Sequence, residues 1–195
     1  MHLKIVQVGD PVLRAAARAL AADEIRSLTT QRLVEWMRET MRDAPGVGLA
    51  APQVGLSIQL AVIEDRAEYL RDVTPERLAE RERQLVAFQV LINPRIVDQS
   101  DEPVEFYEGC LSLPGFSALV KRARAVAVEY LDEHGIPQRV EARGWYARIL
   151  QHEIDHLHGK LYIDRMVSRS FMGRENFERY WKDLPITEAR RLLDA

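Results

Sequence analysis

The chain has 195 residues, with 27 basic and 30 acidic side chains and a formal net charge of −3. This length can bury a substantial core, so we expect one domain across residues 1–195, and the absence of excess positive charge argues against direct recognition of nucleic acid. No stretch approaches roughly twenty uninterrupted apolar residues, and the first residues lack the apolar core of a signal peptide. We therefore expect a soluble cytoplasmic protein that does not bind membranes.

The first quarter of the chain predicts a long amphipathic helix and then a glycine-rich loop. Apolar residues recur at helical spacing from about residue 23 to 42, and Pro45-Gly46 ends this pattern. The segment 46–55, GVGLAAPQVG, contains three glycines and several small residues, which permit close approach of another group. It is longer than the two to six residues that a plain helix-to-strand connection needs, so we favour a loop that contacts a ligand.

The next segment predicts a buried strand followed by a charged surface excursion. Residues 58–63 form an apolar, β-branched run typical of a strand, whereas residues 64–84 are dense in charges of both signs. Within the charged stretch, Thr74-Pro75-Glu76 predicts the start of a short surface helix, with threonine as the N-cap and proline at the first helical position. We assign no chemistry to the segment 64–84.

The remainder of the chain predicts several strands, then a helix, then a helical tail. Asn93-Pro94 predicts a turn between two strands, and Asp132-Glu133-His134-Gly135 predicts the turn of a hairpin. The expected strands are 86–92, a short one near 96, 104–107, 125–131 and 138–142, and the expected helices are 145–157, about 174–181 and one after 187. This mixture predicts an α+β fold, with mostly antiparallel sheets packed around a central helix that begins near Trp145 and ends near Gly159.

The sequence His152-Glu153-Ile154-Asp155-His156 on that helix carries the strongest chemical signal. Residues i and i+4 lie on one helical face, so both imidazoles can bind one metal ion. Glu153 would lie beside the site, where a general base accepts a proton from water activated by the metal. The pattern favours metal-assisted hydrolysis; the alternative is a polar helix face that matches HExxH by chance.

Cys110 is the candidate for the third ligand. It is the only cysteine, which excludes an intrachain disulfide and a four-cysteine zinc site. Thiolate binds borderline metals strongly, and a Cys/His/His set leaves a fourth position open for catalysis. Taken alone, however, a single cysteine is more often a small buried hydrophobic residue.

Three motifs together resemble the signature motifs of the peptide deformylases. They are Gly46-Val47-Gly48-Leu49-Ala50-Ala51-Pro52-Gln53, Glu108-Gly109-Cys110-Leu111-Ser112 and Gln151-His152-Glu153-Ile154-Asp155-His156. They occur in the expected order, and the resemblance extends from Gly9-Asp10-Pro11 to Tyr162-Ile163-Asp164. It implies a hydrolase that removes the formyl group from N-formylmethionine at the start of newly synthesised polypeptides. The same resemblance implies Cys110, His152 and His156 as the metal ligands.

The mechanism implied by the resemblance is attack of metal-bound hydroxide on the formyl carbon. Glu153 would act first as general base and then as general acid, and the Gln53 side-chain amide and the Leu111 backbone N–H would stabilise the oxyanion. Read without the resemblance, Gln53 could be a solvated turn residue. The expected cofactor is one divalent ion per chain, with Fe(II) expected and Zn(II), Ni(II) or Co(II) as alternatives.

The substrate would be an N-formylmethionyl peptide, whose uncharged end and flexible thioether favour an apolar slot. Val47, Phe106, Trp145 and Ile149 are candidates to line the slot, although each could equally be ordinary core. By resemblance, Gly48 and Gly109 would let the peptide backbone pair with the protein as an added strand. We also expect transient proximity to the ribosome, because the substrate is an emerging chain.

Several polar residues have open interpretations. Arg122 could pair with Asp155 or Glu108, but solvent exposure of these carboxylates is an equal alternative. His158 would face away from the metal in a regular helix. Many deformylases have a basic residue shortly after the cysteine motif, whereas this chain has Ser117 there, so its contacts with the peptide beyond methionine are open.

Two competing functions remain at this stage. A zincin-type metalloprotease would take a carboxylate downstream of the second histidine as third ligand, and Glu175 and Glu178 have workable spacing. Alternatively, a metal-bearing module could capture peptide N-termini without turnover, against which the presence of Glu153 and Gln53 argues.

Overall fold

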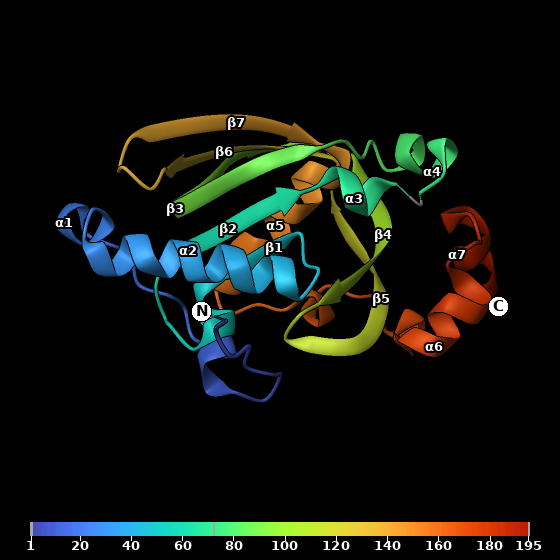
Figure 1. Ribbon diagram of the computed structural model, residues 1–195. Helices are drawn as coiled ribbons and strands as arrows, with labels where there is room; N and C mark the ends of the chain where they lie inside the picture. The colour runs from blue at the N-terminus through green and yellow to red at the C-terminus, as the bar shows by residue number, and fades with distance from the viewer. Residues whose placement is uncertain (1, 72, 195) are drawn as a thin grey trace.

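The computed structural model describes residues 2–71 and 73–194 and has the expected α+β fold, with antiparallel sheets around a central helix (Figure 1). The strands are β1 Gly48–Ala50, β2 Leu60–Asp65, β3 Val86–Gln99, β4 Pro103–Cys110, β5 Leu113–Ala123, β6 Ala125–Leu131, β7 Pro137–Arg143 and β8 Met172–Gly173. The α-helices are α1 Ala22–Ile25, α2 Leu28–Asp43, α3 Ala67–Leu70, α4 Pro75–Glu80, α5 Gly144–Leu157, α6 Arg174–Asn176 and α7 Ile186–Asp194. Shorter helical turns are η1 Pro11–Arg14, η2 Ala51–Val54, η3 Tyr162–Asp164, η4 Ser168–Ser170 and the π-helical η5 Phe177–Trp181.

The strands form two antiparallel sheets. One sheet has the order β1-β2-β3-β6-β7 and the other the order β4-β5-β8. The hairpin of β6 and β7 confirms the predicted pair of strands, which are paired from Ala125↔Arg143 to Leu131↔Pro137. The long strand β5 was missed by the sequence analysis, because its polar and basic positions interrupt the apolar pattern that identifies a strand.

The helices α2 and α5 cover opposite faces of the larger sheet, and β2 is buried between them. Ala61 and Ile63 of β2 belong to the apolar cluster that includes Ile149 and Ile154 of α5. The intervening side chains face the cluster formed with α2, as expected from the two-residue period of a strand. Burial on both faces explains why this segment is a continuous apolar run. It also fixes α5 rigidly against the sheet.

The helix predicted from about residue 23 to 42 is two helices rather than one. α1 and α2 are separated at Arg26-Ser27. The Ser27 hydroxyl accepts a hydrogen bond from the Thr30 backbone N–H at 3.2 Å, so Ser27 is the N-cap of α2. Helical spacing alone concealed this break, although Leu28, the first apolar position after it, is exposed whereas Ile25 and Leu33 are buried.

The turn predicted at Asn93-Pro94 is wrong, because β3 continues through it. Asn93 has a φ of 50°, and the pairing of β3 with β6 shifts register between Ile92 and Arg95. The Asn93 amide exchanges two hydrogen bonds of 2.9 Å with the backbone of Leu20. The sequence signal for a turn therefore marks a β-bulge in a continuous strand.

The charged segment 64–84 is only partly a surface excursion. α4 begins after Thr74 with Pro75 at its first position, which confirms the predicted helix start. However, Asp65 is buried, and its carboxylate accepts two hydrogen bonds from the Arg83 guanidinium, of 2.7 and 2.8 Å. The guanidinium groups of Arg81 and Arg83 both lie 5.2 Å from the ring of Trp145 at the start of α5. The segment thus supports α5 from its N-terminal end.

The glycine-rich segment 46–55 is more regular than the predicted loop. It contains β1 and η2, and Gly55 ends it in the left-handed conformation at φ 84°. Within the described part of the chain, every helix is too short or too polar to span a bilayer.

Replacing Gly144 by alanine should strongly destabilise the protein. Gly144 has a φ of 56°, and an added Cβ would lie 2.5 Å from the carbonyl oxygen of Arg81. We expect a loss of about 2 kcal/mol or more in the free energy of unfolding, measured by urea titration. Gly173→Ala is the matched control, because among the described residues no atom beyond its two chain neighbours lies within 4 Å of its added Cβ. Equal unfolding midpoints for the two variants would contradict this account.

Candidate metal centre

The structure brings Cys110, His152 and His156 together. One ligand atom from each lies within 4.8 Å of the others, and Cys110 Sγ is 3.3 Å from His156 Nε2. The two histidines are one helical turn apart on α5, and the cysteine is the last residue of β4. The rings are 4.9 Å apart and inclined at 74°, so their nitrogens converge on the thiol from different directions.

A hydrogen bond fixes the orientation of His152. Its Nδ1 lies 2.9 Å from Glu108 Oε2, which leaves Nε2 free to act as a ligand. Burial lowers the pKa of His156 well below its usual value, which favours the neutral ring that a metal requires.

The residues present fit a divalent metal ion. One thiol and two imidazoles form a donor set suited to borderline metals such as iron, cobalt, nickel and zinc. Beside them the Glu153 carboxylate is buried, and among the described residues its Oε2 has no hydrogen-bond partner. A buried acceptor of this kind needs a donor, and water bound next to the three ligands would supply one.

Glu153 is closely packed against β1. A Cβ added to Gly48 would lie 2.5 Å from the carboxylate carbon of Glu153, so only glycine leaves space for this side chain. Burial raises the pKa of Glu153 to about 7 in the metal-free protein. The carboxyl group is therefore desolvated and held in one place.

Gln53 is a buried residue of the site rather than a solvated turn residue. Its Oε1 accepts a hydrogen bond from the Ala50 backbone N–H at 2.8 Å. This bond orients Nε2 toward Cys110 Sγ and Ser112 Oγ, each at 3.4 Å. A neutral amide donor thus lies beside the candidate ligand sulfur.

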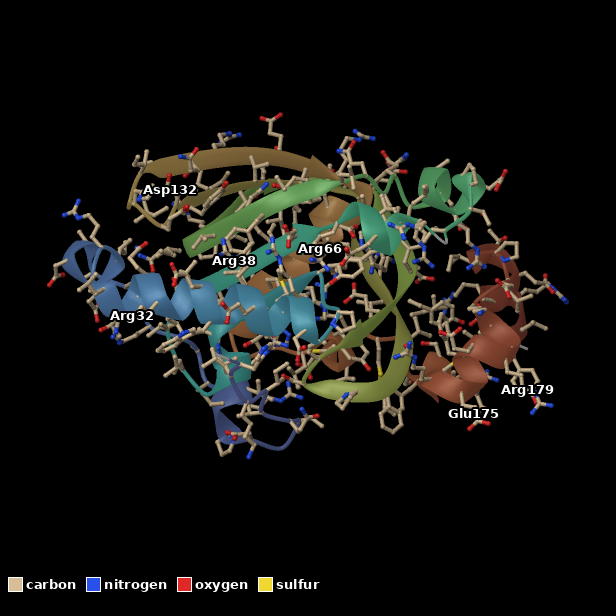
Figure 2. All side chains as sticks on the ribbon, in the orientation of Figure 1. Arg32, Arg38, Arg66, Asp132, Glu175 and Arg179 are labelled. Atoms are coloured by element: carbon tan, nitrogen blue, oxygen red, sulfur yellow. The ribbon has the colours of Figure 1, made fainter. Side chains whose placement is uncertain are left out.

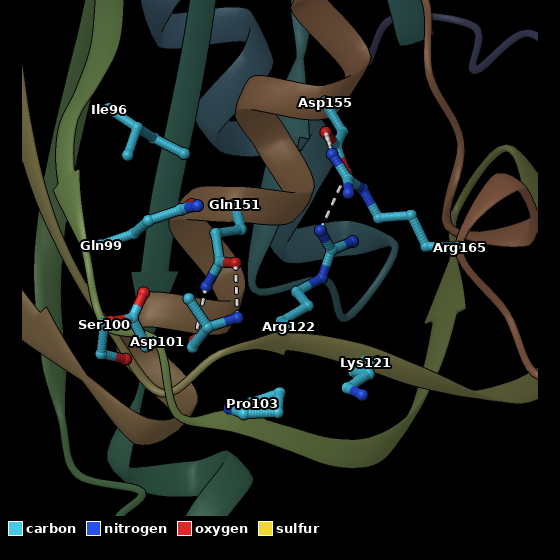
Figure 3. A pocket seen from close by; sticks show the side chains of 11 residues that line it. Ile96, Gln99, Ser100, Asp101, Pro103, Lys121, Arg122, Gln151, Asp155 and Arg165 are labelled. Atoms are coloured by element: carbon cyan, nitrogen blue, oxygen red, sulfur yellow. Dashed lines mark hydrogen bonds and ion pairs between the residues drawn. The ribbon is translucent and has the colours of Figure 1, made fainter.

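A buried ionic network holds Glu108, the hydrogen-bond partner of His152. Glu108 accepts hydrogen bonds from Arg122 at 2.6 and 2.9 Å and from Arg148 at 2.5 Å. Arg122 also donates to Asp155, which in turn pairs with Arg165 (Figure 3). Burial opposes ionisation of Glu108, but Arg122 and His152 hold its pKa well below the usual value. Both pairings of Arg122 considered from the sequence therefore occur in the same network.

Arg148 and Arg165 were missed by the sequence analysis. Arg148 precedes His152 by four residues, so helical spacing on α5 could have identified it as a neighbour of the metal face. Arg165 lies beyond α5, directly after the short turn η3, so no helical spacing relates it to the metal-facing residues.

A cavity of about 770 Å³ opens onto the candidate metal centre. Of the predicted substrate-binding residues, those that line it are Val47, Gly48, Gly109, Trp145 and Ile149, and Leu111 also lines it. Phe106, also predicted to line the slot, is not among the residues that line this cavity. Its ring is buried beneath the guanidinium groups of Arg148 and Arg81, whose carbons lie 5.2 and 5.8 Å from its centroid.

The carboxylates considered for a zincin-type site are not part of the cluster. Glu178 pairs with Lys182 at 2.9 Å, and Glu175 lies on the outer side of the C-terminal helices (Figure 2). His158 is also apart from the cluster, with its Nδ1 at 2.9 Å from the Ile154 carbonyl oxygen. In the part of the chain that the structure describes, Cys110 is therefore the third candidate ligand.

An HExxH helix whose histidines converge with a cysteine of a neighbouring strand, beside a cavity of about 770 Å³, is the arrangement of a metal-dependent hydrolase of α+β fold. The family model described as polypeptide deformylase matches residues 2–171. The chain belongs to the peptide deformylase family, whose members remove the formyl group from an N-terminal methionine.

Similar proteins come from plants and bacteria. Peptide deformylase 1 of Bifidobacterium longum is 45% identical over 98% of this chain and 85% of its own length. Chloroplastic peptide deformylase 1A of Solanum lycopersicum is 43% identical over 93% of this chain, which spans only 64% of that longer protein. The crystal structure of the Met-Ala-Ser-bound class I type b enzyme of Acinetobacter baumannii matches with a TM-score of 0.76 and 33% identity, covering 85% of this chain and 99% of that one.

Proposed function

We propose that this chain removes the formyl group from N-formylmethionyl peptides, with Cys110, His152 and His156 holding one divalent metal ion. The convergence of these three donors beside an unpartnered buried carboxylate is the observation that carries the proposal. The bound Met-Ala-Ser of the Acinetobacter baumannii enzyme has the sequence of a deformylated peptide, which supports a substrate of this kind. We further propose that the whole chain acts as a single catalytic domain.

Glu153 is the proton carrier in this proposal. A divalent ion in the site supplies a Lewis acid that activates water and polarises the formyl carbonyl. The Glu153 carboxylate accepts the proton of the attacking water and then delivers it to the departing amine of methionine. Its burial and its close packing against Gly48 hold it in position for both transfers.

The Gln53 amide and the Leu111 backbone N–H stabilise the negative charge that develops on the formyl oxygen. Gln53 is suited to this role because its buried amide is already oriented by Ala50 and needs no reorganisation during the reaction. Val47, Trp145 and Ile149 form the apolar slot for the methionine side chain.

The peptide backbone lies between Gly48 and Gly109 in this proposal, where no side chains obstruct an extended chain. We propose Fe(II) as the resident metal, because a thiolate with two imidazoles suits it, although Zn(II), Co(II) and Ni(II) suit the same set. Transient proximity to the ribosome follows from a substrate that emerges there.

The direct test is incubation of the metal-loaded protein with formyl-Met-Ala-Ser and measurement of the free amine. We expect turnover, with loss of both metal and turnover in Cys110→Ala and retention of both in Glu175→Ala. Loss of metal in Glu175→Ala with retention in Cys110→Ala would support a zincin-type enzyme instead. Tight peptide binding without release of amine would support a binding module.

Gly48→Ala should impair the reaction without removing the metal. The added methyl group would displace the Glu153 carboxylate, and a misplacement of about 1 Å costs on the order of 100-fold in rate. The measurement is kcat/KM for formyl-Met-Ala-Ser alongside the metal content of the purified variant. Full activity in this variant would show that the position of Glu153 is not critical.

A further inference from the structure

The outer wall of the substrate cavity comes from a segment beyond the family match. The match ends at residue 171, whereas Arg174, Phe177 and Glu178 line the same cavity as His152 and Glu153. These wall residues lie on α6 and η5, at the start of the C-terminal helices (Figure 1). The segment therefore adds contacts to the cavity that the matched region does not supply.

The segment that carries Arg174, Phe177 and Glu178 is joined to strand β5, which borders the cavity, through β8. β8 pairs with β5 through Phe116↔Gly173 and Ser117↔Met172, which places Arg174 directly after the paired residues. The ring of Phe177 lies 4.9 Å from that of Tyr107 on β4, within an apolar cluster that includes α7. The beginning of the segment is thus fixed relative to Ser117 on β5.

Arg174 differs from the other cation of the cavity lining. The residues that line it include two basic side chains, Arg148 and Arg174. Arg148 is buried and engaged by Glu108 at 2.5 Å, so it is not available to a ligand. The Arg174 side chain is 77% exposed, and its ion pair with Glu178 spans 4.0 Å. Glu178 lies closer to Lys182, at 2.9 Å, which leaves the Arg174 guanidinium weakly engaged.

We propose that Arg174 is a specificity-determining residue that binds a carboxylate of the peptide downstream of the formylated methionine. The inference rests on the deformylase function proposed above. Cys110 and Glu153, where the formyl end would lie, line the same cavity as the solvent-exposed Arg174, so a peptide that extends along the cavity toward solvent can reach this guanidinium. A guanidinium there offers several N–H donors in a geometry that matches an acidic side chain.

The test compares two amidated substrates that differ in one charge, formyl-Met-Ala-Glu-amide and formyl-Met-Ala-Lys-amide. We expect the protein to favour the glutamate peptide by about five-fold in kcat/KM, the scale of a solvent-accessible ion pair. Arg174→Glu should reverse the preference, and 0.5 M sodium chloride should weaken it in the wild-type protein.

Arg179→Glu is the matched control. It makes the same charge change in the same segment, but Arg179 lies on the outer side with its guanidinium 5.1 Å from the ring of Tyr180 (Figure 2). We expect this variant to keep the wild-type preference. Equal kcat/KM values for the two peptides in the wild-type protein would overturn the role of Arg174. The same change of preference in Arg174→Glu and Arg179→Glu would also overturn it. Absence of turnover of either peptide by the wild-type protein would overturn the proposed function together with this inference.

Discussion

Glu153→Gln is expected to lower kcat for formyl-Met-Ala-Ser by about 10²- to 10⁴-fold, the range for removal of a general base. The amide has nearly the same shape as the carboxylate but cannot accept a proton from water. The buried Oε2 of Glu153 has no hydrogen-bond partner among the described residues. Replacing this atom therefore breaks no hydrogen bond with the described part of the protein. The measurement is release of free amine under conditions that saturate the enzyme.

Metal content separates catalysis from ligation in this experiment. Glu153 is not one of the three converging donors, so Glu153→Gln should retain its metal. Glu175→Gln, on the outer side of the C-terminal helices, should have wild-type activity and metal content (Figure 2). A Glu153→Gln enzyme within ten-fold of wild-type kcat would contradict the assignment of Glu153 as proton carrier.

Glu108→Gln is expected to lower the free energy of unfolding by about 3–5 kcal/mol, the cost of leaving a buried charge without its partner. Glu108 is 5% exposed and accepts hydrogen bonds from two buried guanidinium groups, those of Arg122 and Arg148. A neutral amide cannot balance either charge. Urea titration of the metal-free protein measures this loss without a contribution from metal binding.

The same substitution should weaken metal binding by about 10- to 100-fold, because Glu108 orients His152, one of the proposed metal ligands. Chelator competition measures this change. Glu105→Gln is the control on the same strand, since Glu105 pairs with Arg190 at 3.3 Å near the surface and should contribute less than about 1 kcal/mol. Equal losses in the two variants would show that the network contributes no more than an ordinary surface ion pair.

The local parts of the site could be predicted from the sequence. The spacing of His152 and His156 on a helix, and the hairpin of β6 and β7, depend on short-range patterns that the chain displays directly. The contribution of Cys110 depended on the resemblance, because nothing in one cysteine indicates which distant helix it faces. The structure brings all three together.

The nonlocal parts could not be predicted in the same way. Arg122 interrupts the apolar pattern of β5, yet its side chain is buried because Glu108 and Asp155 neutralise it. A charge on a strand normally predicts exposure, so Arg122 helped to conceal the strand, although its pairings with Glu108 and Asp155 were considered from the sequence. Phe106 was assigned to the slot from its apolar character alone, and only the three-dimensional arrangement shows the cations that cover it.

The ligand set is tested most directly by X-ray absorption spectroscopy of the zinc-loaded protein. The account predicts one sulfur at about 2.3 Å and two imidazole nitrogens at about 2.0–2.1 Å from the metal, with the sulfur contribution lost in Cys110→Ala. A wild-type spectrum with only nitrogen and oxygen ligands would contradict it.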